Sequence, residues 1–347
     1  MAKNSNLGQA KAAKNDEFYT QYADIQKEVN AYIEYNPDVF RGKTILLPCD
    51  DPEWSNFTKF FAQNFEFFGL KKLISTSYAI ESKKYKTDWQ PTLFETENPL
   101  YNVDKSRVKG KIFTLDHDTN NSGRIDIDDL QWNYLEGDGD FRSAEVTALR
   151  DEADIIITNP PFSLFREFLA WIMEGKKQFL IIGHQNAITY EKVFPLIKAN
   201  KMWLGNGFTG GATHFYSAYE DYATAGNHKE GMIRVSGVMW FTNIDHGRRH
   251  KPLQLMSMED NIKFNKAEYP HYDNYDAIEV SKTMWIPNDY LGLMGVPITF
   301  LDKYCPEQFE LKGYMASHGK EPKGIPNEAP YMNGKWLYNR ILIRKKQ

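Results

Sequence analysis

Four consecutive residues, Asn159, Pro160, Pro161 and Phe162, carry the clearest chemical signal in the sequence. The two prolines restrict the backbone, so the side-chain oxygen of Asn159 and the carbonyl oxygen of Pro160 can face one site as two acceptors. Two acceptors match the two hydrogens of an exocyclic amino group, and they stabilise the positive charge that grows as its nitrogen attacks an electrophilic methyl group. Phe162 adds a flat face for a planar ring. The segment therefore predicts methyl transfer to an amino nitrogen.

The elements on either side of this segment favour that interpretation. The preceding residues, Asp154–Thr158, are β-branched and apolar on both faces, as in a central parallel strand. A helix is expected next, with Ser163 as its cap and Gly175 at its end. The inner stripe of this helix consists of Leu164, Phe165, Phe168, Leu169 and Ile172. The alternative is a plain connecting turn with Phe162 in the core, and the strand–turn–helix setting argues against it.

The first part of the chain alternates strands with helices. Strands are predicted at Lys43–Leu47, Lys72–Ser77, Asp154–Thr158 and Gln178–Gly183. Asp51 can cap a helix that begins at Pro52, whereas residues 81–133 are polar and are interpreted as an insertion. This order predicts an α/β fold with a doubly wound sheet, in which ligands bind beyond the carboxyl ends of the strands.

A change of pattern after about residue 205 predicts a second, smaller part. Gly231–Asn243 is expected to be extended with a break at a glycine, and residues from 245 onward are rich in Tyr, Pro, Asn and Lys. We therefore expect two domains, 1–244 and 245–347. The net charge of −4 argues mildly against a polyanionic partner, but residues 245–347 hold 15 Lys and Arg against 13 Asp and Glu. A contact with a polyanion would have to be local to this part, and a solubilising basic tail is the alternative.

The composition limits the remaining classes of protein. The 347 residues include only two cysteines, Cys49 and Cys305, so a disulfide framework and a cysteine-based zinc site are not expected. The apolar runs are far shorter than the about 20 residues that a membrane helix needs. The first 15 residues are polar and do not read as a secretory signal. We expect a cytoplasmic protein without a membrane partner.

Several segments resemble the EcoRI-type family of adenine-specific (N6) DNA methyltransferases, which use S-adenosylmethionine. Asn159–Phe162 resembles the catalytic motif of methyltransferases that modify amino groups, and Asp16–Gln21 resembles a motif of adenine-N6 enzymes. The longer matching stretches are Leu47–Pro52, Gly137–Ser143, Ala153–Glu167, Phe179–Gly183, Trp240–Asp245, Tyr272–Glu279 and Met294–Asp302. The resemblance implies a Rossmann-like methyltransferase sheet in 1–244 and a smaller C-terminal α+β target-recognition region in 245–347.

The resemblance also implies roles for individual residues. Asn159 and Pro160 would accept the amino hydrogens of a flipped-out adenine, and Phe162 would stack on its ring. The residues implied to bind S-adenosyl-L-methionine are Phe18, Tyr19, Thr20, Asp50, Asp51, Asp140, Phe141 and Pro161.

Two of these cofactor assignments have alternatives. Asp140 can accept from the 6-amino group of the cofactor's adenine and Phe141 can pack on that ring, but the segment can also be a plain acidic loop. For Asp50, helix capping and solvation compete equally with a cofactor role. The Gly-x-Gly turn that most such enzymes place after the first strand is replaced here by Pro48–Asp51. No acidic residue ends the second strand, so no ribose ligand is assigned.

The expected partner is double-stranded DNA, bound by a monomer. Arg248, Arg249 and Lys251 lie in a short basic cluster that can hold phosphates, and a solvated loop is the alternative. The resemblance implies that Trp240 packs on the extruded base, and packing in the protein core is an equally supported alternative. The sequence leaves open the recognised DNA site and whether a cognate restriction endonuclease acts on the same site.

Asp118–Asp129 matches the ligand spacing of a calcium loop, with a glycine at position six and Asp instead of Glu at position twelve. The alternative, a polar hairpin or loop, is favoured because no clear entering helix precedes it. No metal ligand is assigned.

Three other functions remain open on the sequence alone. The first is the same chemistry on RNA or on a protein glutamine amide, and the second is a catalytically silent nucleic-acid-binding relative. The third is a calcium-dependent interaction protein.

Overall fold

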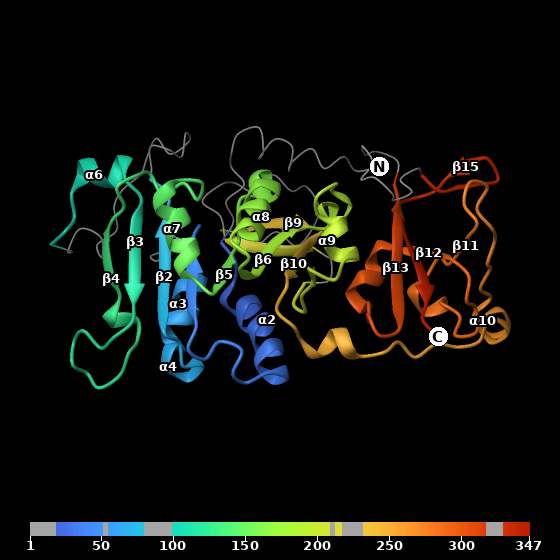
Figure 1. The fold of residues 1–347 in the computed structure, drawn as a ribbon, viewed down its shortest axis with the longest axis horizontal. Helices are drawn as coiled ribbons and strands as arrows, with labels where there is room; N and C mark the ends of the chain where they lie inside the picture. Colours follow the sequence, from blue (N-terminus) through green and yellow to red (C-terminus); the bar gives the residue numbers. More distant parts are fainter. Residues whose placement is uncertain (1–18, 51–54, 80–98, 209–211, 217–231, 317–328) are drawn as a thin grey trace. The chain divides into compact units, whose positions relative to one another are not determined.

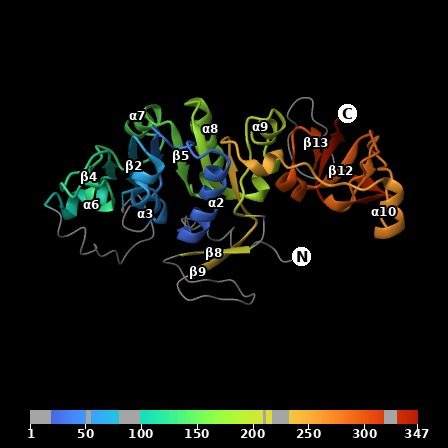
Figure 2. The same cartoon turned by 90° about the horizontal axis from the view of Figure 1, so that it is seen from below.

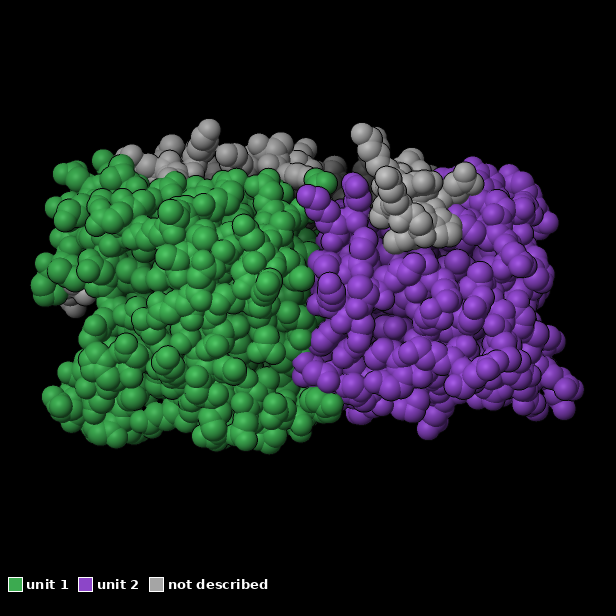
Figure 3. Space-filling view, in the orientation of Figure 1, with its two compact units in different colours: residues 1–184, 211–244 green, residues 185–210, 245–347 purple. Residues whose placement is uncertain are grey.

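The computed structural model describes residues 19–50, 55–79, 99–208, 212–216, 232–316 and 329–347. They belong to two compact units, 1–184 with 211–244 and 185–210 with 245–347 (Figure 3). The chain passes from one unit to the other after residue 244, where we placed the domain boundary. Residues 185–210 were expected in the first domain, but they group with the C-terminal residues.

Seven strands of the first unit form one sheet, in the order β4-β3-β2-β1-β5-β6-β10 (Figure 1). Their bounds are β1 Thr44–Leu47, β2 Lys72–Ser77, β3 Lys111–Leu115, β4 Gln131–Tyr134, β5 Ile155–Thr158, β6 Gln178–His184 and β10 Val238–Thr242. The four central strands, β2, β1, β5 and β6, are parallel. β3 pairs antiparallel with β2, and β10 pairs antiparallel with β6. The predicted α/β sheet is confirmed, and its parallel strands occur where the sequence placed them.

Helices cover both faces of this sheet. Figure 2 shows α7 and α8 on one face, and α2 and α3 on the other. The helices of this unit are α2 Tyr22–Tyr35, α3 Asn56–Gln63, α4 Phe65–Phe68, α6 Val103–Val108, α7 Ala144–Glu152 and α8 Phe165–Glu174, with 3₁₀ turns η2 Ile127–Asp129 and η3 Phe162–Leu164. A separate antiparallel ribbon is formed by β8 Ala212–Tyr216 and β9 Met232–Ser236. The doubly wound arrangement is the one expected from the strand–helix alternation.

Two helix starts differ from the sequence prediction. The helix after β1 begins at Asn56 and is capped by Ser55, whose Oγ accepts from the Phe57 amide at 3.1 Å. The expected start at Pro52 and cap at Asp51 lie outside the described residues. The helix after β5 begins with the 3₁₀ turn η3, so the expected cap by Ser163 is wrong, whereas Gly175 ends α8 as predicted.

The expected polar insertion at 81–133 is only partly separate from the sheet. Its residues 111–115 and the segment 131–134 pair in register as β3 and β4 and extend the sheet beyond β2. β3 alternates buried and half-buried residues, which is the pattern of a strand packed on one face. The prediction of an irregular segment is therefore corrected for these residues, and 80–98 lie outside the described part of the chain.

The loop that matches calcium spacing is held together by its own hydrogen bonds. Asp118 accepts from the amides of Ser122 and Gly123. Asp129 accepts from Thr119, and from the amides of Asn120 and Asp126. Because the carboxylates at positions one and twelve close the turn on backbone amides, this geometry supports the loop interpretation.

The second unit contains a four-stranded sheet in the order β11-β12-β16-β13. The strands described in this unit are β7 Trp203–Leu204, β11 Ile278–Glu279, β12 Met294–Pro297, β13 Phe309–Met315, β14 Tyr331–Met332, β15 Lys335–Trp336 and β16 Arg340–Lys345, of which β14 and β15 pair separately as a hairpin. Its helices and turns are η4 Gln185–Thr189, α9 Phe194–Lys198, η5 Gly247–His250, α10 Met258–Asn265, η6 Thr283–Trp285 and η7 Ile298–Lys303. Residues 245–347 of this unit have the mixed α+β character that the sequence predicted, whereas 185–210 were expected in the first domain.

Candidate functional site

The carboxylate of Asp50 connects two strand ends at the carboxyl edge of the first sheet. Asp50 follows β1 and is 6% exposed. Its two oxygens accept hydrogen bonds from the hydroxyl of Ser55, at 2.6 Å, and from that of Thr158, at 2.6 Å. Ser55 caps α3, and Thr158 ends β5 immediately before Asn159. The arrangement favours a positioning role for Asp50, one that sets the geometry of the Asn159 segment.

The N-terminal segment reaches the same edge through α3. The side-chain amide of Asn56, the first residue of α3, donates to the carbonyl oxygen of Thr20 at 2.8 Å. Thr20 is buried, and Tyr19 is partly buried. Thr20, Asp50 and Asn159 were predicted from separate parts of the sequence, and this run of contacts through Asn56, Ser55 and Thr158 links them. Phe18 and Asp51 lie outside the described residues.

A tight turn closes over the end of β2. Gly139 has φ +86°, and a Cβ atom there would lie 2.3 Å from the carbonyl oxygen of Ser77. A Cβ on Gly110 would also lie only 2.6 Å from that oxygen. The amide of Ala79 donates to the carbonyl of Asp138 at 2.7 Å, which fixes the turn against the strand. Only glycine fits at these positions, because the backbone segments are in direct contact.

This turn carries Asp140 in a defined electrostatic setting. Arg142 forms two side-chain hydrogen bonds with the carboxylate, Nε to Oδ1 at 2.9 Å and Nη2 to Oδ2 at 2.6 Å. The guanidinium lowers the pKa of Asp140 and keeps it ionised. Arg142 also pairs with Glu167 of α8 at 3.0 Å. The Asp140 turn is thereby tied to the helix that follows the Asn159 segment.

Tyr78 lies beside the same carboxylate. Its hydroxyl donates to Asp140 at 3.4 Å, and burial together with the charges of Asp138 and Asp140 raises its pKa to about 12. The phenol therefore stays protonated and acts as a donor at neutral pH. Phe141, in contrast, is buried, and its ring packs against Phe168 and Trp171 of α8. That packing indicates that Phe141 anchors the turn in the core, and leaves its expected contact with an adenine ring as a prediction.

The predicted catalytic segment follows β5 directly. Asn159, Pro161 and Phe162 are partly exposed, while Pro160 is buried. The amide of Leu164 donates to the carbonyl of Pro161 at 2.9 Å and closes the η3 turn. Phe162 is thus outside the fully buried core, in contrast to the alternative that placed it there. The segment stands at the edge where ligands of doubly wound sheets bind.

Trp240 does not belong to this edge. It lies within β10, where its side chain is fully buried and its ring meets that of Phe57 edge-on, with centroids 6.0 Å apart. A ring enclosed in this way has no free face for a nucleobase. The prediction that Trp240 contacts the extruded base is therefore corrected in favour of core packing, the alternative that the sequence left open.

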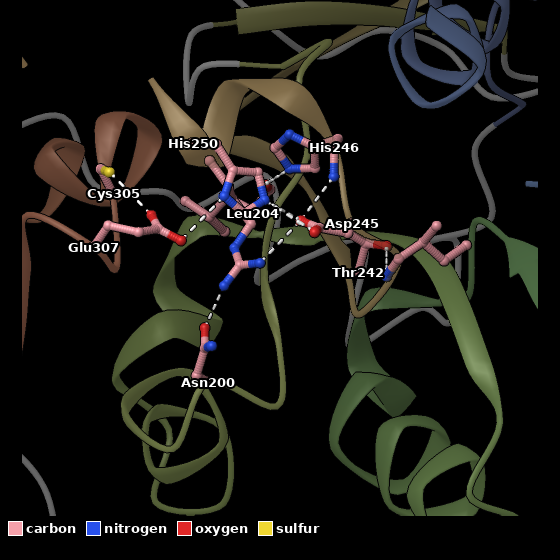
Figure 4. Close-up of polar contacts among 10 residues, drawn as sticks. Asn200, Leu204, Thr242, Asp245, His246, His250, Cys305 and Glu307 are labelled. Carbon is pink, nitrogen blue, oxygen red and sulfur yellow. Dashed lines mark hydrogen bonds and ion pairs between the residues drawn. The ribbon is translucent and has the colours of Figure 1, made fainter. Parts of the chain in front are cut away.

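The basic cluster of the second unit divides into two kinds of residue. Asp245 and Asn200, which accept hydrogen bonds from the first kind, are labelled in Figure 4. Arg249 is 7% exposed, lies 3.7 Å from the centroid of the Trp203 ring, and donates to Asp245 at 3.0 Å and to Asn200. Because this guanidinium is enclosed and both of its terminal nitrogens are bonded within the unit, the prediction that Arg249 binds phosphate is wrong.

The other two members of the cluster remain accessible. Arg248 is partly exposed and forms a 3.5 Å ion pair with Asp302. Lys251 is exposed. Of the three residues that we expected to contact phosphates, Lys251 is therefore the one whose exposure best suits that role.

Several residues of the site were not predicted from the sequence. Thr158, which lies in the matching stretch Ala153–Glu167, and Tyr78 bond to carboxylates that are distant along the chain. Ser55 bonds to Asp50, five residues earlier, but the helix cap was expected at Asp51. Arg142 lies in the matching stretch Gly137–Ser143, which resembles the family, but its pairing with Asp140 was not predicted.

The chain matches one family of proteins along nearly its whole length. A family model described as adenine-specific methyltransferase EcoRI matches residues 6–346. The type II methyltransferase M.EcoRI of Escherichia coli is 42% identical over 351 residues, which cover all of this chain and 98% of the relative. M.MpnI of Mycoplasma pneumoniae is 33% identical over 363 residues, which cover 98% of both chains. M.MgeORF184P of Mycoplasma genitalium is 34% identical over 358 residues, or 98% of this chain and 99% of the relative.

No solved structure matches the chain significantly. Among the helices that the structure describes, none combines the length and the apolar character required to cross a bilayer.

Proposed function

Because the chain belongs to the EcoRI family of adenine-specific methyltransferases, we propose that it methylates N6 of adenine at a specific site in duplex DNA, with S-adenosylmethionine as methyl donor. The observation that carries the proposal is the placement of Asn159–Phe162 directly after β5, at the carboxyl edge of a doubly wound sheet. Since the relatives are named type II methyltransferases, we also propose restriction–modification as the setting in which this chain acts.

The residues at this edge fit the proposed donor. Thr20 Oγ1 is buried and, among the described residues, has no hydrogen-bond partner. A buried hydroxyl of this kind is costly unless a ligand satisfies it. Asp140 offers a carboxylate that Arg142 keeps ionised, and Tyr78 offers a hydroxyl beside it. We therefore propose that Tyr19, Thr20, Tyr78 and Asp140 hold the donor.

The donor, when bound, supplies an electrophilic methyl group on a sulfonium. The chain supplies the rest of the chemistry. The Asn159 side-chain oxygen and the Pro160 carbonyl accept hydrogen bonds from the two N–H groups of the N6 amino group and thereby orient its lone pair. Phe162 stacks on the adenine ring. The adenine has to leave the helix first, which costs a few kcal/mol. Hydrogen bonds fixed in advance by the Asp50–Thr158 contact then stabilise the charge that develops on N6.

The test is methyl transfer from radiolabelled S-adenosylmethionine to three substrates, namely unmethylated duplex DNA, RNA and a protein with accessible glutamines. Label is expected in DNA alone, recovered as N6-methyladenine after digestion to nucleosides. Label in RNA or protein without label in DNA would contradict the proposed substrate. Donor binding without transfer to any of them would indicate a silent relative.

We further propose that the enzyme acts as a monomer, because the chain carries a second unit of its own with which to read DNA. Analytical ultracentrifugation with and without duplex is the check, and a dimer on a single site would contradict it. A restriction endonuclease encoded beside the gene and cutting the same unmethylated site would identify the cognate partner.

A further inference from the structure

A short hairpin of the second unit, β14–β15, is fixed to the body of that unit at its turn. Its turn residues, Asn333 and Gly334, both have positive φ, 52° and 68°, which is the conformation of a tight two-residue hairpin turn. The carboxylate of Asp273 accepts from both turn amides, at 3.3 and 2.8 Å. The Asp273 amide donates to the carbonyl of Tyr331 at 2.8 Å. The turn of the hairpin is therefore held in one conformation, because both carboxylate oxygens of Asp273 are hydrogen-bonded to its amides.

The strand that leaves the hairpin is anchored as well. Leu337 packs against the core cluster formed by Tyr272, Ala277, Met315 and Leu342. Arg340 forms a two-pronged ion pair with the buried Glu279, at 2.8 and 3.0 Å. Because side chains of an extended chain point alternately to opposite sides, packing of the partly buried Leu337 against this cluster turns its two neighbours, Trp336 and Tyr338, outward.

Large aromatic rings consequently project from a rigid support. Tyr331, Trp336 and Tyr338 are 42%, 59% and 84% exposed, and Tyr331 lies directly opposite Trp336 in the hairpin register. Lys335 is exposed next to them. Residues 330–347 contain five Lys and Arg and not one Asp or Glu. Exposed aromatic groups on a pre-ordered, acid-free segment indicate a binding surface for a polyanion with flat apolar faces.

We propose that the β14–β15 hairpin with Tyr338 is the surface that contacts the bases of duplex DNA around the target adenine (β15 in Figure 1). The inference rests on the proposed function and names an element that reads its substrate. A two-stranded ribbon fits the major groove, and the bases left unstacked by a flipped adenine present faces on which Trp336 and Tyr338 stack. Lys335 lies where it can neutralise a phosphate.

Duplex DNA fits this surface better than a protein partner does. Lys335 is exposed and complements a phosphate, whereas an apolar protein interface would leave its charge without a partner. Capture of a protein instead of DNA is therefore one of the results that would overturn the proposal.

The experiment uses the full chain and the duplex that the wild-type enzyme methylates, identified by single-molecule sequencing of treated DNA. The test variant is Trp336→Ala with Tyr338→Ala, and Phe264→Ala is the matched control, because Phe264 is 65% exposed on α10 of the same unit and lies outside the hairpin. The double variant is expected to bind this duplex roughly 5- to 150-fold more weakly for each aromatic ring that no longer stacks on a base. Its affinity for S-adenosylmethionine and its melting temperature should equal those of the wild type.

Base extrusion is followed with 2-aminopurine at the target adenine, whose emission rises when it leaves the stack. The double variant should show a reduced rise, and Trp336→Phe with Tyr338 intact should restore most of it. Lys335→Ala should lower the slope of log K against log salt by about one.

Unchanged duplex affinity and unchanged 2-aminopurine emission in the double variant would overturn the proposal. The same holds for an equal loss on the target duplex and on a scrambled one, since the rings would then not contact the bases around the target. If the wild type itself methylates no DNA, the proposed function fails instead. That result is recognised before any variant is measured.

Discussion

The carboxylate of Asp50 and the hydroxyl of Thr158 are joined by a 2.6 Å hydrogen bond, although the two residues are 108 positions apart in the sequence. Asp50 lies three residues after the end of β1, and Thr158 is the last residue of β5. The second oxygen of Asp50 accepts from Ser55, which starts α3. One buried carboxylate thus fixes where β5 ends, and with it the position of Asn159.

Replacement of Thr158 by Val should slow methyl transfer while leaving donor affinity within about twofold. The substitution keeps the shape but removes the donor to Asp50, which costs about 1–3 kcal/mol of stability, and the displaced Asn159 should lower kcat about 10- to 100-fold. Single-turnover rates with calorimetric donor binding provide the measurement. Thr158→Ser keeps the hydroxyl and is the control. A Val variant that transfers at the wild-type rate would show that the contact has no role in positioning.

Arg249→Ala and Lys251→Ala should behave in opposite ways. The Arg249 variant loses the stacking on Trp203 and the hydrogen bonds to Asp245 and Asn200, so denaturant unfolding should show a loss of about 2–4 kcal/mol. Lys251 is exposed, so the Lys251→Ala variant should keep the stability of the wild type. Loss of one phosphate contact should lower the slope of log K for DNA against log salt by about one. Arg249→Ala with wild-type stability and a reduced salt slope would return Arg249 to the DNA interface.

His246 should make the second unit sensitive to acid. Burial lowers the pKa of His246 to about 4, whereas the ring in an unfolded chain titrates near 6.5. The folded state therefore favours the neutral ring. Its contribution to stability is complete above about pH 6.5 and is lost as the pH falls toward 4, at about 1.4 kcal/mol per pH unit.

Unfolding titrations between pH 4 and 7 check this, since His246→Gln should remove that part of the slope. His250 should show the opposite pH dependence. The side chain of Asp245, with that of Glu307, raises the pKa of His250. The contribution of His250 to stability is therefore present below about pH 6.5 and is lost as the pH rises through the pKa of the folded state. A His246 ring that titrates near 6.5 by NMR would contradict the assigned burial.

Phe162→Ala should weaken methyl transfer and target-base binding together. The ring is only partly buried, so a large loss of stability is not expected. The measurement is the Kd for a duplex with 2-aminopurine at the target, beside kcat and melting temperature. Phe162→Tyr keeps a flat ring and is the control. Lower kcat with unchanged duplex affinity would mean that Phe162 positions Asn159 without contacting the base.

The parallel strands could be predicted because their signal is local. Ile155–Ile157 are β-branched, apolar and buried on both faces, and the turn residues that follow them are prolines. The same reasoning located Asn159–Phe162 at the correct edge of the sheet. β3 was missed, because Lys111 and Thr114 give this five-residue strand the polar character of a loop, although Lys111 is buried on the same face as Phe113.

Side-chain environments could not be predicted, because they depend on partners that are distant in the chain. Arg249 reads as a free cation in a basic run, and only the folded unit brings Asn200 and Trp203 to it. Trp240 had two equally supported interpretations, and contact with Phe57, more than 180 residues earlier, decides between them. Asp50 was placed correctly at the edge, but its link to Thr158 exists only in the assembled sheet.

The most direct test of the whole account is Asn159→Ala, measured by two readouts on the same protein. The side-chain oxygen of Asn159 is proposed to hold the target amino group, and it is not assigned to the donor. The variant should therefore form no detectable N6-methyladenine, while its Kd for S-adenosylmethionine stays within about threefold of the wild type. N6-methyladenine formed at the wild-type rate by a folded Asn159→Ala enzyme would contradict the account.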